Sequence, residues 1–130
     1  MSQAQVIFWI NLVELRNSTI YGKFFDKGLL MILEHCDIEV DPTKGPEFEE
    51  AILRGVNTVI AKAKGFRGFK VNRSIESPAR YLLLLYWDTL ENHTVDFRGS
   101  EAFAEWRAIV GPFFVKPPFV EHMTLVGKSD

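Results

Sequence analysis

Cysteine is scarce in this sequence and long apolar runs are missing, and each shortage excludes a class of protein. Cys36 is the only cysteine in 130 residues, so the sequence holds neither an internal disulfide nor a zinc site built from several cysteines. No stretch reaches the roughly 20 apolar residues that a membrane-spanning helix needs. The apolar segment 5–15 lacks the basic start and the cleavage site of a signal peptide. We therefore expect no membrane partner, and a lone thiol suits a reducing cytoplasm.

The sequence also lacks a predominant charge and the usual ion-binding and phosphate-binding motifs. Lys and Arg number 15 against 17 Asp and Glu, a net charge of −2, so no basic surface for nucleic acid is indicated. The three histidines are far apart, without the local spacing of a metal site, and we predict no metal. No glycine-rich loop precedes a helix, which argues against a bound nucleotide.

Apolar and aromatic residues are abundant instead, above all in the segment 65–87, GFRGFKVNRSIESPARYLLLLYW. Ser77-Pro78 predicts a turn between two strands, 66–76 and 80–87. The second strand is apolar on both faces. Tyr81, Leu83, Leu85 and Trp87 fall on one face, and Leu82, Leu84 and Tyr86 fall on the other. Such a strand must be covered on both sides. Helices of the same chain can cover one side, and we expect a second copy of the chain to cover the other.

The remaining elements complete a recognisable order. Side chains along residues 31–40 alternate between two faces, which predicts a strand. Residues 46–64 are predicted to form an amphipathic helix ended by Gly65, and residues 119–126 a last strand. Residues 88–110 are predicted to be helical in two pieces, the first begun by a variant capping box of Asp88 and Glu91. The order predicts an α+β, ferredoxin-like βαββαβ fold with a four-stranded antiparallel sheet and both helices on one face. The other face would be apolar, which predicts a homodimer.

Residues 1–28 stand apart from this pattern, and we assign the domain to residues 29–130. Two interpretations of the N-terminal extension are open. It is an arm that packs on the domain or its partner, or it is a non-native start, with translation beginning at Met31.

Histidines are the first candidates for chemistry. His93 shares a predicted helix face with Leu90 and Phe97, so it is either a base facing the sheet or a core histidine bonded to a backbone carbonyl. His35 shares a strand face with Asp37, which suits either a carboxylate-oriented imidazole or two solvated side chains. His122 is expected to face the interior of the dimer.

Aromatic side chains gather after the central hairpin. They either belong to the core or line a pocket for a flat apolar ligand: Trp87, Phe97, Phe103, Trp106 and Phe113. Arg98 and Arg107 would steady a phenolate there, or would simply lie in solvent.

Residues 65–114, followed by PPFVEH, resemble the antibiotic biosynthesis monooxygenase family of dimeric α/β barrels. The most telling parts are the glycine-phenylalanine entry to the second strand, Trp87-x-x-x-Glu91-x-His93, and the helix with Ser100, Phe103 and Trp106. The resemblance extends over about residues 31–126. It implies a homodimer.

Within that family, the haem-degrading branch uses an asparagine, a tryptophan and a histidine at fixed places. Trp87 matches, but Asp37 and Arg107 stand at the other two positions. The closer resemblance is to the cofactor-free branch. It implies a cofactor-independent monooxygenase that oxidises a small electron-rich aromatic compound with O2, with no cofactor. His93 would be the catalytic base, and the substrate would contact His35, Asp37, Trp87, Phe97, Phe103, Trp106 and Phe113. The alternative is a non-catalytic dimer that binds a small molecule in the same pocket.

Overall fold

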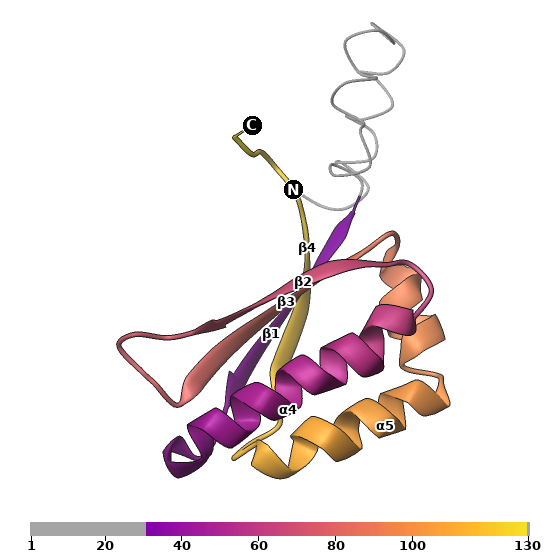
Figure 1. The fold of residues 1–130 in the computed structure, drawn as a ribbon. Coiled ribbons are helices and arrows are strands. Elements are labelled where there is room, and N and C mark those ends of the chain that lie inside the picture. Colours follow the sequence, from indigo (N-terminus) through magenta and orange to yellow (C-terminus); the bar gives the residue numbers. More distant parts are fainter. Residues whose placement is uncertain (1–30, 130) are drawn as a thin grey trace, which may run out of the picture. The chain divides into compact units, whose positions relative to one another are not determined.

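The computed structural model describes residues 31–129, so the predictions about residues 1–28 lie outside the described part. Four strands form one antiparallel sheet in the order β2-β3-β1-β4. They are β1 (Ile32–Glu39), β2 (Phe66–Arg73), β3 (Arg80–Trp87) and β4 (Phe119–Thr124). The helices are α4 (Gly45–Thr58) and α5 (Glu101–Val110), which lie side by side on one face of the sheet (Figure 1). The predicted ferredoxin-like fold is confirmed.

Most element boundaries lie within a few residues of the prediction. The first helix ends earlier than expected, at Thr58, and continues as a 3-10 turn over Ile60–Lys62. Gly65 then takes the predicted left-handed conformation, with φ of 84°. The two helical pieces predicted over 88–110 are confirmed, and the first of them is a π-helical turn over Asn92–Phe97 rather than a regular α-helix.

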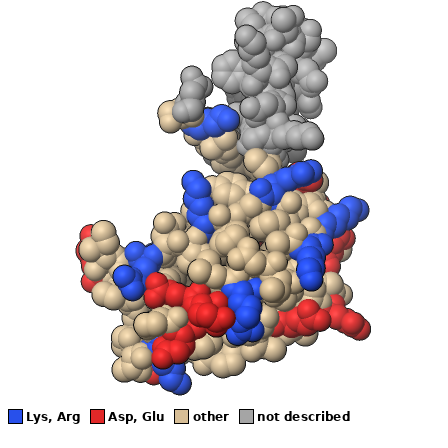
Figure 2. Space-filling model, viewed as in Figure 1, with Lys and Arg blue, Asp and Glu red and all other residues tan. Residues whose placement is uncertain are grey.

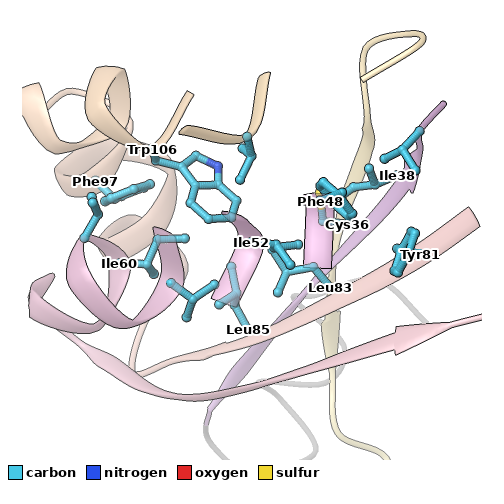
Figure 3. Packing of buried hydrophobic residues seen from close by; sticks show 14 of the residues in the cluster. Cys36, Ile38, Phe48, Ile52, Ile60, Tyr81, Leu83, Leu85, Phe97 and Trp106 are labelled. Atoms are coloured by element: carbon cyan, nitrogen blue, oxygen red, sulfur yellow. The ribbon is translucent and has the colours of Figure 1, made fainter. Parts of the chain in front are cut away.

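One face of each central strand forms the core against the helices. Tyr81, Leu83, Leu85 and Trp87 of β3 are buried, and so are Cys36 and Ile38 of β1 and Val40 just after it. Phe48 and Ile52 of α4 pack on them (Figure 3), and Val56 of the same stripe belongs to the same buried cluster. A side chain at Gly55 would meet the Trp106 ring at 2.9 Å, so glycine lets the two helices approach closely.

The opposite face of the sheet carries no helix of the described residues. Leu82, Leu84 and Tyr86 of β3 point to it and are partly exposed. Phe119 and Met123 of β4 are 62% and 38% exposed. Seen from the helix side, Lys and Arg are interspersed with Asp and Glu rather than gathered by sign (Figure 2).

Candidate functional site

A cavity of about 470 Å³ lies between the sheet and the helical layer. Its walls come from both layers and from the loop that joins α5 to β4. They are mostly apolar or aromatic, and the lining residues that matter below are Glu34, Cys36, His93, Phe97, Arg98, Phe103, Trp106 and Arg107. Figure 3 shows Phe97 and Trp106 near one another beside the sheet.

One carboxylate and two imidazoles form a chain of short contacts beside this cavity. His93 Nε2 lies 2.9 Å from Glu34 Oε1, and His93 Nδ1 lies 2.7 Å from His122 Nε2. The indole N–H of Trp87 donates to the second oxygen, Glu34 Oε2, at 3.3 Å. Glu34 and His93 are 5% and 3% exposed. A buried carboxylate thus has two donors in place of water.

One proton arrangement satisfies both contacts when the His93 ring is neutral. With Glu34 ionised and His93 neutral, His93 donates from Nε2, which leaves Nδ1 as an acceptor. His122 then donates from Nε2 to His93 Nδ1. Burial and the neighbouring His93 lower the pKa of His122, in keeping with a neutral ring. Both ring nitrogens of His93 are therefore engaged within the protein.

The strand register explains how residues so far apart in sequence meet. Glu34 of β1 lies directly opposite His122 of β4 on one side and Leu85 of β3 on the other. Directly paired residues of antiparallel strands point to the same face of the sheet. Glu34 and His122 therefore both project toward the helices.

His93 is positioned by the π-helical turn that follows β3. The Thr89 backbone N–H donates to Asn92 Oδ1 and the Asn92 N–H donates to Thr89 Oγ1, each at 3.1 Å. Asp88, the predicted first residue of the capping box, accepts two hydrogen bonds from Arg67 at 2.6 and 2.8 Å. Gly65 makes room for Asn92, and the His93 ring stacks on Trp87 at 5.5 Å. Single π-helical turns are frequent at functional sites.

Several of the predicted pocket residues do come together. Phe97, Phe103 and Trp106 line the cavity, and Trp87 contacts both His93 and Phe97 from the end of β3. Phe113 does not line it and packs on Phe48 instead, at 5.8 Å between ring centroids. Arg98 and Arg107 also line the cavity, and Arg107 lies 5.7 Å over the Phe103 ring.

His35 and Asp37 require a correction, because they lie on the sheet face opposite the cavity. They alternate with Glu34, Cys36 and Ile38, whose side chains point toward the helices. Asp37 accepts two hydrogen bonds from Arg80, at 2.9 and 2.6 Å, and this partner lowers the pKa of the carboxyl. Neither residue reaches a ligand held beside His93.

Glu34 and His122 were overlooked as site residues in the sequence. His122 was expected in the dimer interior but faces the helical layer, bonded to His93. Glu34 carried a usable signal, since it is an acid on the strand face that it shares with Cys36, Ile38 and Val40. A carboxylate on an otherwise apolar face must find buried donors, and such groups are frequent at functional sites.

The described residues contain no cluster of three or more His, Cys, Asp and Glu side chains arranged for a metal ion. Glu34, His93 and His122 bind one another directly instead. No helix within residues 31–129 is long and apolar enough to cross a membrane.

Comparison with known proteins places this architecture among related chains. Residues 31–109 match the family model described as antibiotic biosynthesis monooxygenase. The protein YczJ of Bacillus subtilis (strain 168) is 36% identical over 92 residues, which cover 71% of this chain and 96% of YczJ. A crystal structure from Bordetella bronchiseptica, of a protein described as a putative antibiotic biosynthesis monooxygenase, is 42% identical with a TM-score of 0.70, covering 74% of this chain and 97% of that one.

A more distant structure shares the fold. It is a monooxygenase from the gene ActVA-Orf6 of Streptomyces coelicolor, in complex with the ligand Nanaomycin D. It is 21% identical with a TM-score of 0.66, over 77% of this chain and 91% of that one.

Proposed function

This chain belongs to the antibiotic biosynthesis monooxygenase family, and from that premise we propose that it oxidises a small electron-rich aromatic compound with O2, without a cofactor. The observation that carries the proposal is an aromatic-walled cavity with a buried carboxylate–histidine pair at its edge. Its volume, about 470 Å³, is in the range of small-molecule sites.

The walls suit a flat, apolar ring system. Phe97, Phe103 and Trp106 offer ring faces and edges, and aromatic pairs prefer such offset and edge-on contacts. Arg98 and Arg107 place positive charge on the same lining, and neither forms a described ion pair with a carboxylate. A substrate that becomes a phenolate or enolate would be stabilised there.

The reaction requires only the substrate, O2 and a proton acceptor. Loss of a proton from an anthrone-like carbon leaves an electron pair that the ring system delocalises. O2 takes up these electrons and forms a carbon-bound peroxide, which takes a proton. Loss of water from that peroxide leaves a quinone, so one O2 yields one quinone oxygen and one water.

Dimerisation through the open sheet face remains part of the proposal. Leu82, Leu84 and Tyr86 form an apolar centre there, and Phe119 and Met123 extend it along β4. A second copy of the chain would bury this surface, in line with the dimeric barrel that the family resemblance implies. The buried free thiol of Cys36 suits a reducing compartment, and the cytoplasm remains our predicted location.

One observation favours the alternative, a non-catalytic dimer that binds a small molecule. Both nitrogens of His93 have protein partners, as they would in a purely structural histidine. Both functions require that the cavity binds a ligand, and only the oxygenase consumes O2.

The deciding experiment measures binding and oxygen consumption on the same protein. Anthrone and Nanaomycin D serve as probes, and quenching of tryptophan fluorescence that is lost in Trp106→Phe reports occupancy of the cavity. An oxygenase consumes one O2 for each anthrone converted to anthraquinone in metal-free buffer. Quenching by both compounds without oxygen uptake above the protein-free rate would favour the binding protein.

A further inference from the structure

We propose that Glu34, and not His93, is the general base that faces the ligand, and that His93 and His122 are its positioning residues. The inference rests on the proposed function, since it names the group that removes the substrate proton. It stands on the geometry of the cavity wall.

Elimination among the lining residues leads to Glu34. Arg98, Arg107 and Lys116 are donors only at neutral pH. Cys36 is the one thiol on the wall, and burial raises its pKa to about 12, so it stays protonated. His93 has Nε2 on Glu34 at 2.9 Å and Nδ1 on His122 at 2.7 Å, which leaves no free ring nitrogen for a substrate.

Glu34 keeps the capacity to accept another proton. A carboxylate has about four acceptor positions on its two oxygens. His93 and Trp87 use one on each oxygen, at 2.9 and 3.3 Å. Glu34 is itself one of the residues that line the cavity, so a ligand held there lies beside the side chain that carries the remaining acceptor positions. In the proposed step the substrate proton takes one of these positions, and both existing hydrogen bonds stay in place.

The proton step balances within the site. The Glu34 carboxylate takes the proton from the acidic substrate carbon, and the electron pair of the broken C–H bond stays on that carbon. Glu34 becomes a neutral acid that still accepts from His93 and Trp87. The same proton then returns to the peroxide formed with O2, which restores the carboxylate.

His93 and His122 hold this carboxylate in place. A neutral His93 donates to Glu34 Oε1, and donation from His122 holds His93 in the tautomer that can give that bond. Neither imidazole touches the reacting carbon in this arrangement.

The test follows proton abstraction without oxygen. Anthrone is incubated with the protein in D2O under argon, and deuterium at its methylene carbon is measured by NMR against a protein-free control. The wild type should accelerate exchange. Glu34→Gln should lower that acceleration by about 100-fold while anthrone still quenches the tryptophan fluorescence. Glu50→Gln, at an exposed glutamate of α4, is the matched control.

Chemical rescue tests whether a carboxylate is the group that takes the proton. Added formate should restore part of the exchange in Glu34→Gly, because formate supplies the missing carboxylate. The inference is overturned if Glu34→Gln binds anthrone and exchanges at the wild-type rate. If Glu34→Gln fails to fold, Glu34→Asp takes its place, because it keeps the carboxylate but draws it back by one methylene. An unchanged rate of exchange in Glu34→Asp also contradicts the inference.

The wild type itself distinguishes this inference from the proposed function. Exchange under argon without oxygen consumption in air would refute the oxygenase and leave Glu34 as the base. A wild type that causes no exchange at all would refute Glu34 as a base.

Discussion

Replacing Gly65 by alanine should destabilise the protein, because the new side chain would collide with Asn92, which holds the turn that carries His93. Gly65 has φ of 84°, where a residue with a Cβ costs roughly 1–2 kcal/mol. The new Cβ would also lie 2.0 Å from Asn92 Oδ1, closer than atoms can approach. Asn92 must therefore move, which endangers its hydrogen bonds with the Thr89 N–H and with Asp96. Each such bond contributes about 0.5–1.5 kcal/mol.

These contributions sum to about 2–5 kcal/mol of lost unfolding free energy, which lowers the melting temperature by on the order of 10 °C or more. Circular dichroism during thermal and urea unfolding measures the loss. Gly68 supplies the control, because it has φ of 141° and a Cβ added there would meet no atom within 4 Å. Gly68→Ala should therefore cost only the backbone contribution.

A double-mutant cycle isolates the contact itself. In Gly65→Ala/Asn92→Ala the clash is gone, so the combined loss should fall short of the sum of the single losses by about 1 kcal/mol or more. Gly65→Ala should also slow anthrone exchange, since the turn that carries His93 shifts. The reasoning is refuted if Gly65→Ala costs no more than Gly68→Ala, or if the two substitutions are additive.

Three other predictions concern the sheet, the N-terminus and the thiol. Leu83 is buried in the core, so Leu83→Asp should lower the free energy of unfolding in urea by several kcal/mol. Leu84 lies on the open sheet face, so Leu84→Asp should yield folded monomers in sedimentation. A wild type that is itself monomeric at micromolar concentration contradicts the dimer. A chain that begins at Met31 should match the full-length melting temperature by calorimetry, and a drop of more than a few degrees would show that the N-terminal extension packs on the domain. Burial raises the pKa of Cys36 from 9.0 to about 12, so the thiol ionises at lower pH in the unfolded chain, and the free energy of unfolding should fall as pH rises from 9 toward 12. Cys36→Ala should make this fall smaller in urea unfolding. An unchanged pH dependence in the variant would contradict the burial of the thiol.

The sequence by itself determined the elements and their order. Alternation along residues 80–87, the stripe of Phe48, Ile52 and Val56, and the left-handed Gly65 are local properties, set by strand period, helix period and backbone sterics. The topology followed from them, because few arrangements connect such a series of elements compactly. Trp106 and Phe97 were likewise predictable as neighbours of one cavity from the helix faces they occupy.

Only the tertiary structure decided which polar residues meet. Alternation along β1 separates Glu34 from His35 and Asp37 and places Glu34 on the more apolar face, but it does not tell which buried donors Glu34 meets there. The pairing of β1 with β3 and β4 puts Glu34 opposite His122. Trp87 and Glu34 are 53 positions apart and His93 and His122 are 29 apart, so their contacts depend on strand register. Register is fixed by the burial of whole sheet faces, a property of the assembled sheet that no local pattern contains.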